Sequence, residues 1–273
     1  MVLYISSNRR ESGRIMASEN SSLTRWANII AFVLMVLING LAGSTTTIGG
    51  KNTAQISDAN PTLITPAGYV FAIWGIIYVL LGVFVVYQAL PSQRGKDFQK
   101  KIGWFFVLSC AANIIWLFLW QFEYLSLSLV LMFLLLASLI LIYLRLNIGK
   151  SKADTREILA VHLPFSVYLG WITIATIANI SATLVSMNWD SVFLGVNAET
   201  WAILVIIVAV AITVLVLATR KDVAYALVVI WALIGISVKQ SGNQTIVLLT
   251  EISAVVVAVV VLATILLTVL RRR

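Results

Sequence analysis

Nine aromatic and polar side chains recur at helical spacing in three apolar stretches of the chain. Successive members lie three or four positions apart, with Ala175 filling one step of the third set, so each set shares one face of a helix. The sets are Phe71, Trp74 and Tyr78; Asn113, Trp116 and Trp120; and Tyr168, Trp171 and Asn179. Aromatic rings with a few polar groups among them suit a flat, apolar ligand.

The depth of these residues favours a pocket inside a membrane over a belt at its surface. Trp and Tyr normally gather at the membrane interfaces, but at about 1.5 Å per residue Trp171 lies roughly 15 Å into its helix. The three sets meet at one level, below residues 45–66, and Asn39 falls there too. We expect the Trp rings to pack on the ligand and the Tyr and Asn side chains to orient it by hydrogen bonds. The alternative is helix packing, with the Asn side chains bonded across the helix interfaces.

Residue patterns typical of catalysis are missing from the sequence. It has no Gly-rich phosphate loop, no His/Glu zinc motif and no Gly-x-Ser-x-Gly motif. The only histidine, His162, begins an apolar stretch, where it is interfacial or, as an alternative, a single axial haem ligand. The only cysteine, Cys110, excludes a multi-cysteine metal site. Lys239 and Glu251, near two helix ends, are expected to form an ion pair. We therefore expect no catalytic residues and no metal site.

Composition defines the fold class. Of 273 residues, 60% are hydrophobic and 11% are charged, whereas a soluble domain is about 45–50% apolar and about 25% charged. Apolar stretches of about 20 residues follow one another, and within lipid such stretches must be helical. The predicted spans are 26–44, 67–90, 102–122, 124–146, 161–186, 199–219, 222–239 and 246–270. The sequence predicts an all-α, polytopic transmembrane bundle of about eight helices.

The basic residues predict the orientation of this bundle. With eight spans, both termini lie on one side of the membrane. Of the 19 basic residues, all but Lys51 and Lys239 fall on that side. Positive charge collects in cytoplasmic loops, so we expect a multi-pass protein of the cell membrane with both termini cytoplasmic. The net charge of +8 follows from this topology. The expected partners are the lipid bilayer and an apolar small molecule, and not a nucleic acid, because no folded domain carries a basic face.

Four segments outside the spans have predicted roles. Residues 1–25 are polar, basic and rich in Ser, and we expect them to be disordered. Residues 121–124 and 220–222 must form tight turns, because the spans on either side have almost no linker. Residues 45–66 form the longest external loop, and such a loop can act as a lid over a pocket.

Three motifs occur in order along the second, third and fifth predicted spans. Residues 65–78 read Thr-Pro-Ala-Gly-Tyr-Val-Phe-Ala-Ile-Trp-Gly-Ile-Ile-Tyr, residues 113–116 read Asn-Ile-Ile-Trp, and residues 168–171 read Tyr-Leu-Gly-Trp, followed by two threonines and Asn179. With these motifs, residues 26–188 resemble the TspO/translocator-protein family, also called tryptophan-rich sensory proteins. Tyr69 stands in place of a Trp of the family's second-helix motif, and a proline of that motif is missing.

The resemblance implies a five-helix core with an apolar pocket under the loop after the first helix. Family ligands are porphyrins, haem precursors and other tetrapyrroles, with sterols in animals, and the resemblance implies no required cofactor. Residues 189–273, with three further spans, have no counterpart in the five-helix family, so we expect them outside the pocket, serving packing or association as in a homodimer. The expected function is that of a non-enzymatic binding or sensory protein of the membrane. The alternatives are a small-molecule transporter and an enzyme of light-dependent porphyrin degradation.

Overall fold

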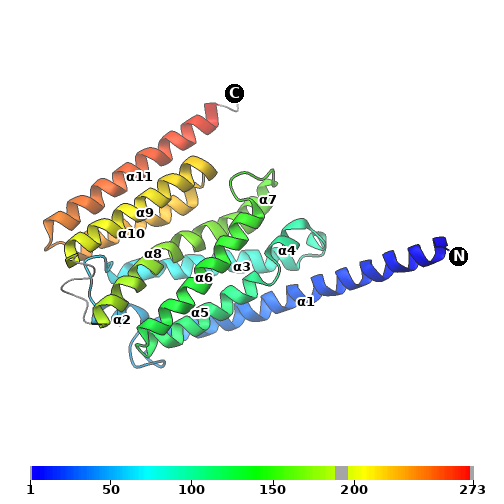
Figure 1. Ribbon diagram of the computed structural model, residues 1–273, viewed down its shortest axis with the longest axis horizontal. Helices are drawn as coiled ribbons and strands as arrows, with labels where there is room; N and C mark the ends of the chain where they lie inside the picture. Colours follow the sequence, from blue (N-terminus) through cyan, green and yellow to red (C-terminus); the bar gives the residue numbers. More distant parts are fainter. Residues whose placement is uncertain (1, 188–195, 271–273) are drawn as a thin grey trace.

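Apolar helices aligned along one axis form the body of the protein (Figure 1). The structure is a computed structural model that describes residues 2–187 and 196–270. Six of its helices are long and apolar enough to cross a membrane, and two more, α5 and α10, are shorter but apolar. Together they match the eight predicted spans. They are α1 (Val2–Ser44), α3 (Ile73–Ala89), α5 (Phe105–Gln121), α6 (Leu125–Leu146), α8 (Leu163–Ser186), α9 (Ala198–Arg220), α10 (Val223–Lys239) and α11 (Gln244–Leu270).

Short helical elements connect or extend these spans. They are α2 (Thr53–Ala59), the 3-10 turns η1 (Gly68–Ala72) and η2 (Pro91–Gln93), α4 (Asp97–Ile102), α7 (Thr155–Glu157) and the π-helical turn η3 (Ile158–His162). The π turn has a local cause, because Pro164 has no N–H to donate to the carbonyl four residues earlier. The residue before this proline, Leu163, donates its N–H to the carbonyl of Ile158, five residues earlier, which is the hydrogen bond of a π turn.

The two predicted tight turns are confirmed. Helix α5 ends at Gln121 and α6 begins at Leu125, and Glu123 between them takes a left-handed conformation with φ 59°. Lys221, with φ 55°, makes the same turn between α9 and α10. Asp222 then caps α10 by accepting a hydrogen bond from the backbone N–H of Tyr225 at 3.2 Å. One left-handed residue reverses the chain in each case, which is a common way for a helix to end.

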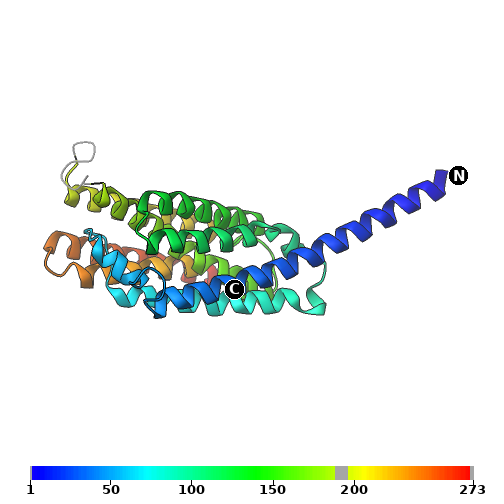
Figure 2. The same ribbon diagram turned by 90° about the horizontal axis from the view of Figure 1, so that it is seen from below.

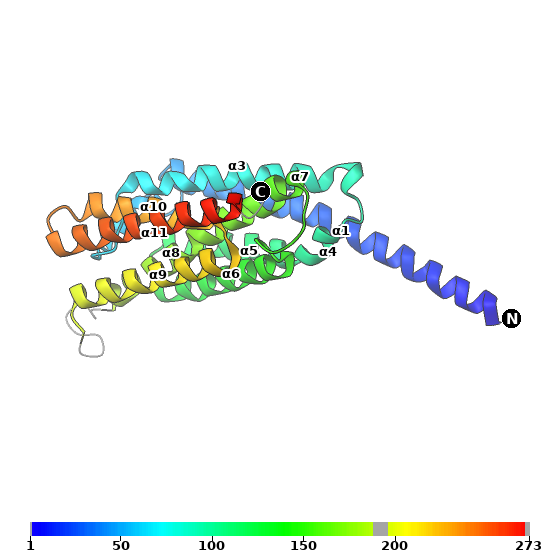
Figure 3. The same cartoon turned by 90° about the horizontal axis from the view of Figure 1, so that it is seen from above.

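Helix α8 is the centre of the bundle. It contacts α3, α6, α9 and α10, and Figure 3 shows it between the N-terminal helices and the C-terminal ones. The start of α1 and the last turns of α11 point to the end of the bundle opposite α2 (Figure 1). Residues 2–25, for which the composition predicts disorder, continue the first span as a helix that projects from the bundle (Figure 2). Residues 189–195 and the three final arginines lie outside the described residues.

Helix α10 is docked directly on the core through two glycines and one carboxylate. A side chain at Gly170 of α8 would meet the backbone oxygen of Tyr225 at 3.0 Å. At Gly235 of α10, a Cβ would overlap a methyl group of Val70 in η1. Small residues allow this close approach of helices in a membrane. At the start of α10, near Tyr225, the buried Asp222 accepts hydrogen bonds from Tyr143 of α6 at 2.9 Å and from Ser166 of α8 at 2.7 Å.

Candidate functional site

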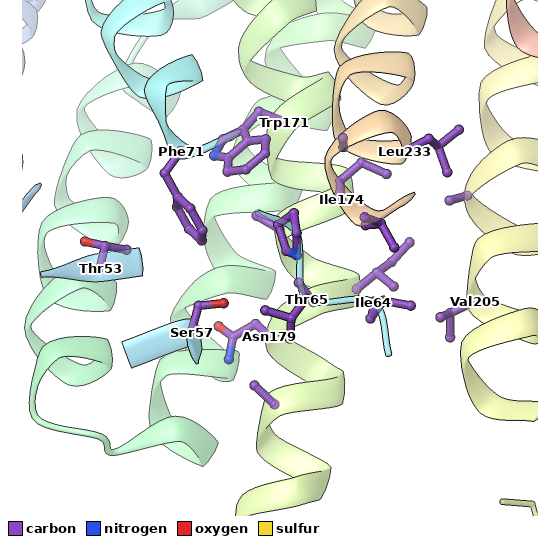
Figure 4. A pocket seen from close by; sticks show the side chains of 18 of the residues that line it. Thr53, Ser57, Ile64, Thr65, Phe71, Trp171, Ile174, Asn179, Val205 and Leu233 are labelled. Atoms are coloured by element: carbon purple, nitrogen blue, oxygen red, sulfur yellow. The ribbon is translucent and has the colours of Figure 1, made fainter. Parts of the chain in front are cut away.

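A cavity, here called the central cavity, lies beside α8 near the end of the bundle where α2 sits. It contains about 60 Å³ of free space. Figure 4 shows its lining: Phe71 and Trp171 lie close together, while Val205 of α9 and Leu233 of α10 line the opposite side. Thr53, Ser57, Ile64 and Thr65 come from the segment that joins α1 to η1. One wall of the cavity is therefore aromatic and the other is aliphatic.

The aromatic wall is a continuous cluster of rings around Trp74. The ring centre of Trp74 lies 6.2 Å from that of Trp116 and 6.1 Å from that of Trp171. Phe71 contacts Trp171 edge to face at 6.0 Å, and Trp116 stacks on Trp120 at 5.8 Å. Contacts of this geometry stabilise aromatic pairs by about 0.5–1.5 kcal/mol each beyond the burial of area. The rings therefore support one another in the absence of a ligand.

The structure brings six of the nine predicted site residues to the central cavity. These are Phe71, Trp74, Trp116, Trp120, Trp171 and Asn179. The other three lie behind or beside it. Tyr168 is fully buried against Trp74, with ring centres 6.0 Å apart, and Asn113 is fully buried on α5. Tyr78 stacks on Trp74 at 5.7 Å and lines a separate, neighbouring cavity.

The two asparagines form hydrogen bonds across helix interfaces. Asn113 accepts from the side-chain amide of Asn39 on α1 at 2.7 Å. Asn179 accepts from the indole N–H of Trp116 at 2.9 Å and donates to the hydroxyl of Ser128 on α6 at 3.1 Å. These are the bonds that the packing alternative predicts. Asn179 therefore fixes the orientation of the Trp116 ring in the cavity wall.

One fully buried polar atom of the lining has no hydrogen-bond partner among the described residues, and that atom is the indole nitrogen of Trp171. The side chain is only 3% exposed. Most buried N–H groups in proteins are paired, and one left unpaired costs about 1–3 kcal/mol. The indole N–H of Trp120, by contrast, donates to the backbone carbonyl of Thr53 at 3.3 Å. Trp171 is therefore an aromatic residue of the lining whose fully buried donor is left for a ligand.

The expectation that the three C-terminal spans lie outside the pocket is wrong for two of them, α9 and α10, if the pocket is the central cavity. Val205, Ile206 and Ala209 of α9 and Ala232, Leu233 and Ile236 of α10 line the central cavity. The sequence alone does not identify these residues, because aliphatic side chains in a cavity wall are of the same types as those that face lipid. Two glycines within apolar spans, Gly170 and Gly235, could have indicated that α10 packs on the core, because small residues mark close helix contacts in membranes.

The segment 45–66, here called the lid segment, closes the α2 end of the cavity. On one side, Gln121 of α5 donates to the backbone carbonyl of Lys51 at 2.8 Å, and Lys51 pairs with Glu123 at 2.8 Å. On the other side, Gln240 after α10 donates to the carbonyls of Thr62 at 3.0 Å and Thr65 at 3.1 Å. The lid segment is thus held by polar contacts from both flanks.

Other candidate residues lie away from the cavity. Lys239 pairs with Asp58 of the lid segment at 2.7 Å, and Glu251 accepts a hydrogen bond from Ser237 at 3.0 Å, so the expected pair of Lys239 with Glu251 is not formed. His162 is buried in η3, at the opposite end of α8 from Asn179. Cys110 is fully buried and free. No group of three or more His, Cys, Asp or Glu side chains that could hold a metal occurs within the described ranges.

The fold and this cavity define a polytopic α-helical membrane protein with an internal cavity, aromatic on one side, near one end of its bundle. A family profile described as TSPO-like protein matches residues 25–268, and the chain belongs to that family. The match continues through α9, α10 and most of α11, and so includes the three C-terminal helices. No curated protein and no solved structure gave a significant match.

Proposed function

We propose that the protein is a non-enzymatic binding or sensory protein of the membrane whose ligand is flat and apolar, with a tetrapyrrole such as a porphyrin as the leading class. The central cavity would be the binding site. Three kinds of contact support this proposal: aromatic faces on α3, α5 and α8, an aliphatic surface on α9 and α10, and hydroxyl groups from the lid segment. A pocket that is mostly apolar with a few polar groups is typical of small-molecule sites.

The observation that carries the proposal is the unpaired indole N–H of Trp171 in this wall. A buried donor without an acceptor is destabilising unless a ligand supplies the acceptor. A carbonyl or an uncharged carboxyl group on the edge of a flat ring system would do so, while Trp74 and Trp116 pack on its faces. The side-chain carboxyl groups of a porphyrin, in their protonated form, offer such an oxygen, and the protonated form avoids burying an unpaired charge.

The lining also supports binding over catalysis. The described residues around the central cavity include no ionisable side chain, so no acid–base pair among them faces the ligand. Nor do they include His, Cys, Met or Tyr, the side chains that hold haem iron. A metal-free tetrapyrrole therefore fits the lining better than a haem that needs an axial ligand from the protein.

The central cavity is too small for such a ligand, so we expect binding to change the conformation of the protein around it. Drug-sized ligands occupy pockets of about 300–1,000 Å³, but the central cavity contains about 60 Å³. A ligand of that size would therefore have to displace side chains of the cavity wall. In a sensory protein, this movement of the cavity wall would signal that the ligand is bound.

Titration of the purified protein in lipid nanodiscs with protoporphyrin IX tests the proposal. The fluorescence of the porphyrin should be followed, because nine Trp residues make quenching of the protein signal unspecific. Trp171→Leu is expected to weaken binding by about 1–3 kcal/mol, or about 5–150-fold. Trp171→Phe keeps a ring but removes the N–H and should cost about 1 kcal/mol.

Trp104→Leu is the matched control. Trp104 is 49% exposed and lies at the start of α5, outside the cavity lining, so its loss should leave affinity unchanged. Wild-type affinity in both Trp171→Leu and Trp116→Leu would show that the aromatic residues serve helix packing only. Loss of porphyrin under light, with new products, would instead indicate an enzyme.

A further inference from the structure

A second cavity, here called the side cavity, adjoins the central one and is much larger, at about 430 Å³. It lies between the end of α1, the start of α2, and the start of α3. Phe71, Trp74 and Trp116 line both cavities, so their rings form the partition between them, together with Thr53. The central cavity is therefore separated from a larger space by side chains alone.

The mouth of the side cavity faces outward between α1 and α3. Four of its lining residues are exposed glycines: Gly40 and Gly43 on α1, Gly68 in η1 and Gly75 on α3. A Cβ added at Gly40, Gly43 or Gly75 would meet no atom within 4 Å. These glycines thus leave open space beside the backbone and are not sites of close helix packing.

The gap between α1 and α3 does not extend along the whole helix pair. Further from the lid segment, a Cβ at Gly82 of α3 would lie 3.5 Å from the ring of Phe32 on α1, which is ordinary contact distance. The two helices are therefore in contact there and apart only beside the side cavity. Because α1 and α3 are both membrane spans, the opening faces the acyl chains or the adjoining interface.

On the lid side, another cavity of about 440 Å³ shares Ile64 and Thr65 with the central one, and the lid segment there is held in place by several contacts. Gln121 and Gln240 each donate to lid carbonyls, and Lys51 and Lys239 form ion pairs on its two flanks. The N–H of Ala67 also donates to the carbonyl of Gly235 at 2.9 Å. Opening the lid segment would break all of these contacts together. The partition between the two cavities, by contrast, makes few polar contacts among the described residues: the Trp116 indole donates to Asn179, and the carbonyl of Thr53 accepts from Trp120.

We propose that the ligand reaches the central cavity sideways from the bilayer, between α1 and α3, and that Phe71 and Trp74 act as the gate. This inference rests on the proposed function of the central cavity. Phe71 lies in the 3-10 turn η1 at the start of α3, and hydrogen-bond geometry in a 3-10 turn is poorer than in an α-helix. Rotation of its ring would join the two cavities into one space of the size that small ligands need. The ligand class is therefore a molecule that dissolves in the membrane.

Narrowing the mouth tests the route. Gly40→Leu and Gly75→Leu, alone and together, add bulk where the structure has room. Wild type and variants in nanodiscs are mixed rapidly with vesicles that carry protoporphyrin IX, and association and release are followed by porphyrin fluorescence. We expect the double variant to slow both rates at least tenfold while its equilibrium affinity changes less than about threefold, because the leucines stand outside the binding cavity. Ile76→Phe, on the lipid side of α3 (Ile76 is 55% exposed), is the control of similar bulk and should leave the rates unchanged.

A second design avoids any effect on folding. Gly40→Cys is purified and then labelled with a bulky maleimide, with the unlabelled protein as its reference, since the native Cys110 is buried. Wild-type rates in both the labelled protein and the double leucine variant would overturn the side route, and faster rates in Gln240→Ala would then assign access to the lid segment. If the wild type binds no protoporphyrin IX at equilibrium, the proposed function itself is wrong.

Discussion

Replacing Gly235 by alanine adds a methyl group at the point where α10 crosses the start of α3. Its Cβ would overlap Cγ2 of Val70 and approach the Cβ of Pro66 to 3.6 Å. Val70 is fully buried, so the overlap is relieved only by moving its side chain or by moving α10. Overpacking of this kind costs about 1–3 kcal/mol, and we expect Gly235→Ala to be destabilised by this amount.

A second substitution, Val70→Ala, should compensate for the overlap that Gly235→Ala creates. Val70→Ala removes the methyl group that the new Cβ would overlap. Alone, it leaves a gap and loses mainly dispersion contacts, because lipid is as apolar as the protein interior, and we expect a cost of about 1–2 kcal/mol. In the double variant the added methyl group occupies the vacated space. The double variant should therefore be about 1–2 kcal/mol more stable than the sum of the single effects, as for other residues in contact.

The assay is thermal unfolding of the four purified proteins in one detergent, with porphyrin affinity measured alongside. Gly235→Ala should also weaken porphyrin binding, because Val70 and Phe71 belong to the same turn, η1. If Gly235→Ala unfolds at the wild-type temperature, or if the two single effects simply add, the close contact of α10 with η1 does not exist. That result would also remove the reason for placing α10 in the cavity wall.

Three further predictions follow from the same contacts. Asp222→Leu, which loses the hydrogen bonds from Tyr143 and Ser166, should lower stability by about 1.5–3 kcal/mol in the same unfolding assay, and an unchanged midpoint would mean that the carboxylate does not fix α10. Truncation after Met187 removes the aliphatic wall of the central cavity, and in a core that stays folded it should weaken porphyrin binding more than tenfold. Affinity near that of wild type would show that the five-helix part holds the ligand alone. For the proposed orientation in the cell membrane, Thr46→Cys should react with an impermeant thiol reagent outside intact cells and Ser92→Cys should not, and the reverse pattern would invert the topology.

The spans and their turns were predictable because a membrane restricts the choices. The backbone must be helical within lipid, so apolar length fixes each span. The near absence of a linker around Glu123 and Lys221 then demands a reversal by a single left-handed residue. The aromatic sets were visible for a similar reason: helical spacing puts Trp116 and Trp120 on one face whatever the neighbours are.

The partners of the polar residues were not predictable from spacing. Asn113 and Asn179 have the same sequence context as ligand-binding residues, but each pairs with a side chain more than 50 positions away, Asn39 and Ser128 respectively. Whether an amide faces a ligand or another helix depends on which helices are neighbours, and the spacing within one helix holds no information on that. The same limit hid Val205 and Leu233, whose side chains differ in no chemical respect from lipid-facing ones.

Helix α10 links the parts of the site that the sequence keeps apart. It supplies one side of the central cavity through Leu233 and Ile236, and its Trp231 donates to the carbonyl of Val70 at 3.2 Å. Lys239 at its end and Gln240 just after it hold the lid segment. A change in the position of α10 would thus act on the cavity wall, on the turn that positions Phe71 and on the lid together. If a ligand displaced this wall, α10 would move with it, and its contacts with α9 and α11 would carry the displacement into the other C-terminal helices.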